Sequence, residues 1–424
     1  MQSSRSTLGL IFLTVFISMV GFGIVIPVLP VYAVQKQFDM SPQSLGLLVG
    51  VFSLVQLISS PFFGLLSDRI GRKPVLIISI LGTAVGFFVI GLAQSAFMLF
   101  LGRIIDGASG GNVATAQACI ADVTPPDKRS KAMGVIGAAF GLGFVMGPAL
   151  GGWLAQYSSQ LPFFFAGFLS LINGVLVAML LPETYPKEHR LAGVRRSSLL
   201  DVFKNGRGAL IALLLAASLL STTGFAYIHV LFALFCKDRF SWDVRQTSMA
   251  FAYVGILAVL VQGGLLRRLL KKNIEKEVAL LGAVLLAASL FWLPRVSGVG
   301  QFFWGSCALM ALGNGLLTPT LSGLASRHVD GDVQGRLMGL MSMAGSLGRF
   351  LGPTLAMVPF PSDFTRLGRP LAEDILQIAN AGYSRSFSQG AILILISFAC
   401  ILAVRIPVEI TRDQAPEVPR PAGT

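Results

Sequence analysis

The sequence predicts an all-α membrane protein in which twelve transmembrane helices form two pseudo-symmetric six-helix bundles. The first observation is composition: of 424 residues, 54% are hydrophobic and 12% are charged, and the mean hydropathy is +0.74. Soluble domains carry about 25% charged residues, so a disordered chain, a disulfide scaffold and an ordinary soluble enzyme are excluded. The second observation is a series of twelve apolar runs, and the third is a repeat between the two halves.

The twelve runs are each long enough for a transmembrane helix, which needs about 20 residues to cross about 30 Å of hydrocarbon. They are continuous and do not alternate with a period of two, so they favour helices over strands. The first is too long for the core of a signal peptide, and we expect it to remain as a span. An outer loop is expected near residues 359–383. The runs lie at residues 8–34, 44–66, 74–94, 97–121, 131–155, 161–182, 208–235, 246–266, 277–294, 299–325, 335–358 and 385–408.

The basic residues predict how these helices cross the membrane. With both termini in the cytoplasm, the inner segments hold 23 Lys and Arg and the outer loops hold 8. Cytoplasmic loops of membrane proteins carry this excess. We therefore expect an integral protein of a bacterial inner membrane with both termini inside. The net charge of +13 then reflects topology and requires no nucleic acid.

The polar segment 183–207 divides the chain into an N-terminal bundle, 1–182, and a C-terminal bundle with a short tail, 208–424. It is expected to be a cytoplasmic linker, and a regulatory or partner-binding segment is the alternative. The halves also share a glycine pattern with an offset of 205. Duplicated six-helix halves with the substrate path between them are a known transporter plan. The repeated positions are Gly134, Gly143, Gly147 and Pro148 in the fifth run, and Gly339, Gly348, Gly352 and Pro353 in the eleventh.

The sharpest local signal lies between the second and third runs, where residues 64–74 read Gly-Leu-Leu-Ser-Asp-Arg-Ile-Gly-Arg-Lys-Pro. Gly64 lets a neighbouring helix approach closely, and Gly71 permits a tight turn. Asp68 has cationic partners within the next five residues, and such a cluster can lock two helices in one conformation and release them in another. A simple basic turn is the alternative. The candidate latch consists of Gly64, Asp68, Arg69, Gly71, Arg72 and Lys73.

Three motifs resemble those of the major facilitator superfamily. Residues 64–74 resemble the signature between its second and third helices, and residues 21–30 look like the start of its tetracycline-efflux branch of twelve-helix drug:proton antiporters. The resemblance covers nearly the whole chain. It implies an alternating-access carrier with a central cavity lined mainly by helices 1, 4, 7 and 10. A third stretch resembles the helix-5 antiporter motif, with Gly134, Gly143, Gly147, Pro148, Gly151 and Gly152.

Arg103 and Asp106 are expected inside the fourth span. Three residues apart on a helix, they share a face and can pair. Asp106 is the one acid that we place well inside a span, and an intramembrane ionisable group is a functional-site hypothesis by default. Because burial and Arg103 act in opposite directions on the protonation of this carboxyl, the pair is a candidate proton-coupling site. Arg103 also matches the family's helix-4 arginine. A static ion pair that fixes helix packing is the alternative.

Arg349 is the second cation within a span. It is expected to bind an anionic substrate group or to take part in gating, and contact with helix-end carbonyls or with a water-filled cavity is the alternative. His229 titrates near neutrality in water, and a hydrogen-bonded structural role is its alternative. The remaining polar side chains in apolar runs indicate either a wet cavity or hydrogen bonds between helices. The candidate cavity residues are Gln56, Asn112, Gln117, His229, Asn314 and Arg349.

The sequence departs from the tetracycline branch at that branch's membrane acids. Ser18 stands at the place of the helix-1 acid, and the acids of helices 3 and 9 correspond to positions near Gly86 and Leu285. A chelated cationic tetracycline would find few partners, so we do not expect that substrate. In the second half Arg268 stands in the loop where the family has an acid, and this loop is expected to be a degenerate copy.

These observations predict a secondary active transporter that exports a small amphipathic or anionic organic compound by proton-coupled alternating access. Its expected partners are the substrate, protons and membrane lipid, with no nucleic acid, and it is expected to be a monomer. The sequence has no phosphate-binding Gly-Lys-Ser/Thr loop, catalytic set or metal site, so we expect neither an enzyme nor a cofactor. The alternatives are a uniporter or nutrient importer on the same fold and, more remotely, a non-transporting receptor or scaffold.

Overall fold

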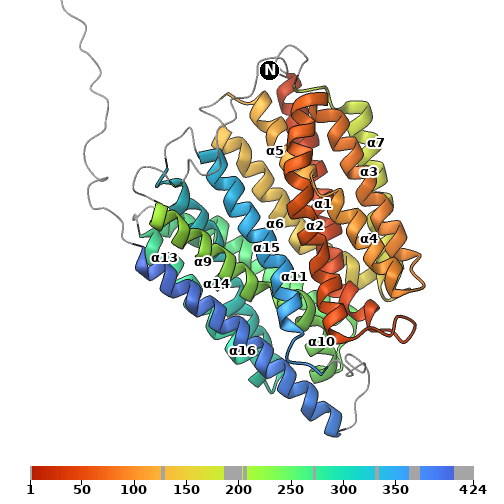
Figure 1. The fold of residues 1–424 in the computed structure, drawn as a ribbon, viewed down its shortest axis with the longest axis vertical. Helices are drawn as coiled ribbons and strands as arrows, with labels where there is room; N and C mark the ends of the chain where they lie inside the picture. The colour runs from red at the N-terminus through yellow and green to blue at the C-terminus, as the bar shows by residue number, and fades with distance from the viewer. Residues whose placement is uncertain are drawn as a thin grey trace, which may run out of the picture.

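The computed structural model describes residues 2–125, 129–185, 203, 208–270, 274–329, 334–361 and 373–404. These residues form long helices that run side by side along the long axis of the molecule (Figure 1). Ten helical rods are long and apolar enough to cross a membrane. The other two are α4 with α5, interrupted at a Gly-Gly pair, and the glycine-rich α15, so the described chain forms the expected twelve.

The N-terminal bundle contains six rods, of which the fourth is broken. Its helices are α1 (Gln2–Ala33), α2 (Pro42–Ile70), α3 (Arg72–Gly91), α4 (Ala96–Ala108) with α5 (Asn112–Val123), α6 (Arg129–Leu154) and α7 (Leu161–Leu180). The interruption between α4 and α5 falls at Ser109–Gly111, where two consecutive glycines have low helix propensity. Most of the expected linker, 186–202 and 204–207, lies outside the described residues.

The C-terminal bundle repeats this plan and carries π-helical turns in two rods. Its helices are α9 (Gly208–Ala226) with α10 (Ile228–Phe240), α11 (Val244–Leu260) with η3 (Val261–Leu266) and α12 (Arg267–Leu269), α13 (Glu275–Trp292) with η5 (Leu293–Arg295), η6 (Gln301–Cys307) with α14 (Ala308–Ser326), α15 (Gln334–Ala356) and α16 (Glu373–Ala403).

Most expected spans agree with these helices to within a few residues, and α16 is the exception. It begins at Glu373, twelve residues before the predicted start of the run at 385–408. The prediction of an outer loop through residue 383 was therefore wrong for residues 373–383. Residues 373–383 mix polar and apolar side chains. A helix that continues beyond the hydrocarbon does not need a long apolar run, so hydropathy does not reveal it. Residues 362–372 lie outside the described chain.

The glycine repeat marks equivalent helix contacts in the two bundles. A Cβ atom added at Gly147 of α6 would lie 2.7 Å from the carbonyl oxygen of Val20 in α1. A Cβ at Gly352 of α15 would lie 2.6 Å from the carbonyl oxygen of Thr223 in α9. Real Cβ atoms do not approach so closely, so only glycine permits α6 to pack on α1 and α15 on α9. The surroundings of Gly134 lie outside what the structure describes.

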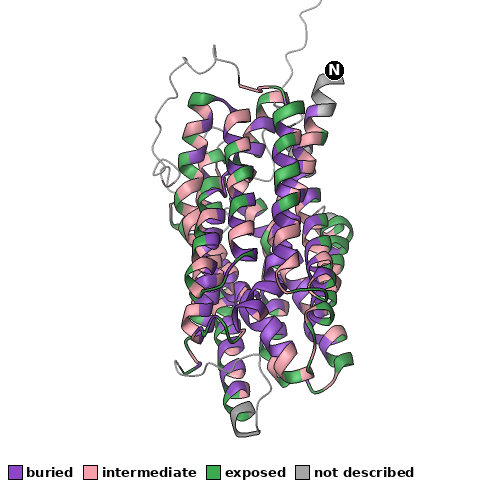
Figure 2. Ribbon diagram, turned by 90° about the vertical axis from the view of Figure 1, so that its right-hand side faces the viewer, coloured by how far each residue is buried: buried purple, intermediate pink, exposed green. Residues whose placement is uncertain are grey.

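The two bundles touch at the side of the molecule opposite the start of α1. There a Cβ at Gly50 of α2 would lie 2.6 Å from the carbonyl oxygen of Phe350 in α15. Gln43 Nε2 donates to the carbonyl oxygen of Phe360 at 2.8 Å. Figure 2 shows the buried segments in the middle of the molecule gathered in the lower half of the view, away from the N-terminus. Contacts of α2 with the C-terminal end of α15 and the residues after it therefore seal this opposite side.

The same helix faces are unpacked on the side where α1 begins, here called the N-terminal side. Gly64 lies about five turns after Gly46 and thus on the same face of α2, at 3.6 residues per turn. Gly46 is pressed against Pro353 of α15, and Gly335 lies about five turns before that proline. Among the described residues, a Cβ at Gly64, Gly335 or Gly339 would meet no atom within 4 Å. The helices are thus closed at one end and apart at the other.

Candidate functional site

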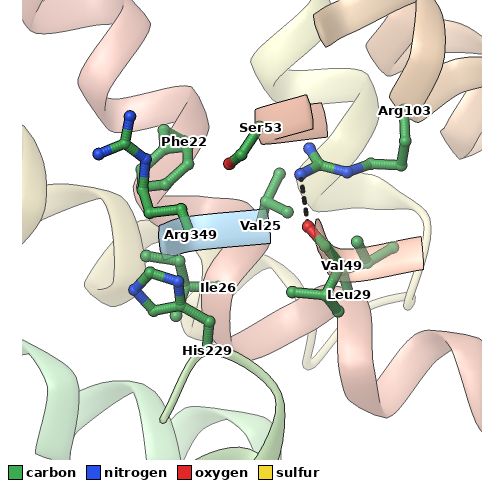
Figure 3. Close-up of a pocket in the computed structure, with 9 residues that line it drawn as sticks. All are labelled: Phe22, Val25, Ile26, Leu29, Val49, Ser53, Arg103, His229 and Arg349. Carbon is green, nitrogen blue, oxygen red and sulfur yellow. Dashed lines mark hydrogen bonds between the residues drawn. The ribbon is translucent and has the colours of Figure 1, made fainter. Parts of the chain in front are cut away.

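A cavity lies between the two bundles (Figure 3). It is lined by the halves of α1 and α2 that are nearer the sealed side of the molecule. Its empty volume is about 320 Å³, including its opening. The wall is apolar except for one hydroxyl, one imidazole and two guanidinium groups. It is formed by Phe22, Val25, Ile26 and Leu29 of α1, Val49 and Ser53 of α2, Arg103 of α4, His229 of α10 and Arg349 of α15.

Arg103 enters the cavity from the N-terminal bundle and is only 2% exposed. Its Nη1 lies 3.3 Å from Asp106 Oδ2, which confirms the expected pairing on one helix face. Its Nη2 donates weakly to the carbonyl oxygen of Val49 at 3.4 Å, and Figure 3 shows this guanidinium directed into the cavity. The Nε is buried without a hydrogen-bond partner. Arg103 therefore keeps donor capacity that its protein partners do not use.

Asp106 lies behind Arg103 and is 5% exposed. It is held against α3 at Gly86, where an added Cβ would lie 2.9 Å from the Cβ and backbone nitrogen of Asp106. Gly86 is close to the position where the tetracycline-efflux branch was expected to carry its helix-3 acid. The backbone and Cβ of Asp106 on α4 thus occupy the space that a helix-3 side chain would otherwise fill, which the sequence alone did not indicate.

His229 and Arg349 reach the same cavity from the C-terminal bundle. His229 lies two residues after the interruption at Tyr227 between α9 and α10. Its ring packs edge-on against Phe22 at 6.3 Å and Phe225 at 6.0 Å between centroids. Arg349 Nη2 donates to Ser346 Oγ at 2.8 Å. Among the described residues no carboxylate pairs with Arg349, so its charge faces the cavity without an acid.

Four further candidates do not line this cavity. Gln56 donates to the carbonyl oxygen of Gly110 at 3.2 Å, and Asn112 Nδ2 donates to Ser18 Oγ at 2.8 Å. These two side chains therefore tie helices of the N-terminal bundle together. Gln117 is exposed on α5, and Asn314 accepts from Thr318 Oγ1 one turn along its own helix at 3.0 Å.

The candidate latch forms a network inside the N-terminal bundle. Arg72 Nη1 lies 2.6 Å from Asp68 Oδ1, and its Nε lies 3.0 Å from Asp122 Oδ2 at the end of α5. The backbone nitrogen of Arg72 donates to Glu183 Oε1 at 2.9 Å. Gly71 has a φ of 108°, in the region that favours glycine. Asp122 and Glu183 were missed because they lie 50 and 111 residues from Arg72.

Arg69 is exposed and Lys73 is partly exposed. The backbone nitrogen of Lys73 donates to Glu183 Oε2 at 3.4 Å. Gly64 is one turn from Asp68 on α2 and faces no neighbour within 4 Å. The cluster therefore joins α2, α3, α5 and the segment after α7, while its glycine remains free to receive another helix.

Metal chemistry has no evident place in the part of the chain that the structure describes. No group of three or more His, Cys, Asp or Glu could hold a metal ion there. The four cysteines are free thiols. The chemistry of the cavity is therefore that of guanidinium, imidazole, hydroxyl and apolar groups.

Comparison with known proteins agrees with this architecture. Residues 11–353 match the model of the Major Facilitator Superfamily. The chain is 32% identical over 356 residues to the tetracycline resistance protein, class C, of Escherichia coli, covering 84% of this chain and 89% of that protein. It is 30% identical over 363 residues to multidrug resistance protein 2 of Bacillus subtilis (strain 168), covering 84% and 90%.

Two solved structures share the fold at lower sequence identity. The human organic anion transporter MFSD10 is 22% identical with a TM-score of 0.69, covering 94% of this chain and 99% of that one. A bacterial homolog of the human lysosomal transporter Spinster is 16% identical with a TM-score of 0.77, covering 95% and 97%.

Proposed function

This chain belongs to the major facilitator superfamily, and we propose that it is a proton-coupled exporter of a small amphipathic or anionic organic compound. The observation that carries the proposal is the cavity between the bundles, into which Arg103 and Arg349 extend from opposite sides. Ionisable groups within a membrane mark substrate or ion pathways. Relatives that are at least 30% identical are named as tetracycline and multidrug resistance proteins, which supports export.

We place the N-terminal side in the cytoplasm of a bacterium. The excess of Lys and Arg in the segments on that side supports this orientation. The described structure is then an inward-facing state, because α2 and α15 are apart at Gly64 and sealed at Gly46 and Gly50. A monomer surrounded by lipid is sufficient for this mechanism, since the cavity lies within one chain.

Alternating access requires the open end to close as the sealed end opens. The unpacked faces at Gly64 and at Gly335 and Gly339 are suited to meet, because glycine allows helices to approach closely. Asp68, one turn after Gly64, would then approach the first turn of α15, where the helix dipole favours a carboxylate. In the described state, Asp68 instead pairs with Arg72 at 2.6 Å. The latch would thus stabilise the outward-facing state.

We assign proton coupling to Asp106 with Arg103. The carboxyl is buried, and its cationic partner Arg103 contacts it at 3.3 Å, a long distance for a charged pair. A conformational change that moves Arg103 would change the proton affinity of Asp106, since a nearby cation favours the ionised form. Proton binding and bundle movement are then linked in both directions.

A second candidate is an importer that moves an anion together with a proton. The charge of the cavity favours this candidate. Two guanidinium groups line the cavity, and Asp106 lies behind one of them, Arg103. An anion that engages Arg103 would leave Asp106 more disposed to take a proton, so both would bind together.

The direction of proton-coupled flux separates these candidates. The purified protein is reconstituted in liposomes, and uptake of a bound compound is measured with the lumen acidic, alkaline or equal in pH. Export by exchange predicts accumulation against the proton movement, and co-transport predicts accumulation with it. Downhill flux that ignores the gradient would indicate a uniporter. If a bound compound shows no flux at all, the transport proposal is wrong and a receptor is favoured.

A further inference from the structure

We propose that the cavity recognises an organic anion, and that Arg103 and Arg349 hold its acidic group between them. This inference rests on the proposed transport through the same cavity, but it does not depend on the direction or coupling of transport. It specifies the acidic group, the two residues that bind it and the apolar body that it requires. It also excludes a cationic compound from the site.

The charge that faces the cavity favours an anionic ligand. Two guanidinium groups line it, and in the described part of the chain no carboxylate lines it with them. Asp106 contacts Arg103 from behind, along the same helix. Arg349 has a hydroxyl partner, Ser346, in place of an acid. A buried cation without an acid carries an uncompensated charge that an anionic ligand removes.

Arg103 has hydrogen-bond donors that the protein does not use. Guanidinium has five N–H donors in a planar fork that suits carboxylate, sulfonate or phosphate oxygens. Arg103 is only 2% exposed, and its Nε has no hydrogen-bond partner. Its contacts to Asp106 and Val49 are long, at 3.3 and 3.4 Å. Figure 3 shows the Arg103 guanidinium directed toward the hydroxyl of Ser53 and the Arg349 guanidinium beside the Phe22 ring. Ser53 lines the same cavity and offers a further polar group.

The rest of the cavity wall is apolar and partly aromatic. Four apolar side chains of α1 form one side, and Phe22 packs against Phe52 and Phe144 with centroids 5.9 Å apart. His229 adds a second ring against Phe22. A ligand of this cavity therefore needs an apolar, preferably aromatic, body as well as its acidic group. Inorganic anions would satisfy the arginines and leave this wall in contact with water.

The two arginines belong to different bundles, which gives the anion a role in transport. Without a ligand the two positive charges repel across the interface. An anion between them reverses the sign of that interaction and draws α4 and α15 together. Because this contact depends on the relative position of the bundles, the ligand binds one conformation better than another and shifts the equilibrium between them.

The test uses probes that share one body and differ in charge. Purified wild-type protein is titrated with 2-naphthoate, naphthalene-2-sulfonate and 2-naphthyl phosphate, and with 2-naphthamide and 2-naphthylmethylammonium. Binding is measured by the shift in thermal unfolding and by calorimetry. At least one anion should bind, and the amide and ammonium should bind at least 10-fold more weakly. Absence of binding by all three anions, or equal binding of the amide or ammonium, would overturn the proposal.

The variants assign the recognition to the two arginines. Arg349→Gln should weaken anion binding at least 10-fold and leave binding of the amide within 2-fold, while Arg349→Lys should retain part of the selectivity. Arg295→Gln, at an exposed arginine over Phe291, is the matched control and should bind like the wild type. Unchanged anion affinity in a folded Arg349→Gln protein would refute the assignment. Selective anion binding without flux would instead refute the transport proposal alone.

Discussion

In the C-terminal bundle, Arg327 Nη2 lies 2.6 Å from Glu275 Oε1, on the side of the molecule where α1 begins. The N-terminal bundle has a corresponding ion pair with the acid and the base exchanged. There Arg72 begins α3 and pairs with Asp122 at the end of α5. Glu275 likewise begins α13, and Arg327 follows the end of α14. By the offset of 205, Arg327 stands at the position of Asp122, and Glu275 lies two residues before the position of Arg72. The two halves therefore keep the same ion pair between the same two rods while its polarity is inverted.

The two pairs should contribute unequally to stability. The Arg72 and Asp122 side chains are 9% and 17% exposed, whereas Arg327 is 55% exposed. Arg72→Gln removes a guanidinium that is 9% exposed and serves two partly exposed acids, Asp68 and Asp122, and should cost about 3 kcal/mol. Arg327→Gln removes a half-exposed guanidinium from one acid, Glu275, whose side chain is 10% exposed, and should cost about 1–2 kcal/mol. Denaturant unfolding in detergent measures both. Equal losses would show that burial does not decide these contributions.

Charge exchange tests whether the C-terminal pair acts as a pair. Glu275→Arg alone should destabilise the protein because it places two cations together. Adding Arg327→Glu should recover most of the lost stability and restore the polarity of the N-terminal bundle. Failure of the double variant to recover would indicate that Glu275 acts through its other neighbours.

Closure of the N-terminal side should depend on Gly64. Gly64→Leu adds no clash in the present state, since nothing lies within 4 Å, but it would obstruct the approach of α15. Flux should fall at least 10-fold while the unfolding midpoint stays close to that of the wild type. Gly9→Leu, also without neighbours within 4 Å on the exposed part of α1, is the control. Normal flux in Gly64→Leu would contradict the proposed closure.

Gly86 should be needed to keep Asp106 in place. A Cβ there meets the Asp106 backbone nitrogen at 2.9 Å, so Gly86→Ala forces α3 and α4 apart at a cost of about 1–3 kcal/mol. Coupled flux should fall by more than downhill flux. Gly174→Ala is the control, because its Cβ meets the movable tip of Leu81 at 3.1 Å. Loss of coupling in both variants would show a general packing effect.

The helices were predictable from sequence because apolar runs report burial in lipid directly. Cavity membership was not, because it depends on which face of a helix meets which neighbour. Asn112 is an example, because its amide donates to Ser18 of α1 and does not line the cavity. The α1 residues that line the cavity are apolar. Arg103, Arg349 and His229 could be singled out because charged or titratable groups are rare inside spans. Phe22 could not, since one phenylalanine among 31 carries no such signal.

The Gly264–Arg268 segment, expected to be a loop but helical in η3 and α12, illustrates a different limit. Its loss of the family's acid predicted a degenerate copy of the latch. The structure places the charge pair of that half elsewhere in sequence, at Glu275 and Arg327. Sequence comparison by motif looks for the same residue types at the same spacing. A pair with exchanged charges escapes such a search, although it joins equivalent helix ends.

The most direct test of the account is flux in the Asp106→Asn variant. Asparagine keeps the size of the side chain but cannot exchange a proton. We predict that a pH gradient no longer drives accumulation, while downhill exchange of the same compound and the unfolding midpoint are retained. Asp243→Asn is the control, since an asparagine at this exposed N-cap of α11 can still cap the helix. Full gradient-driven accumulation in Asp106→Asn would contradict the assignment of proton coupling to Asp106.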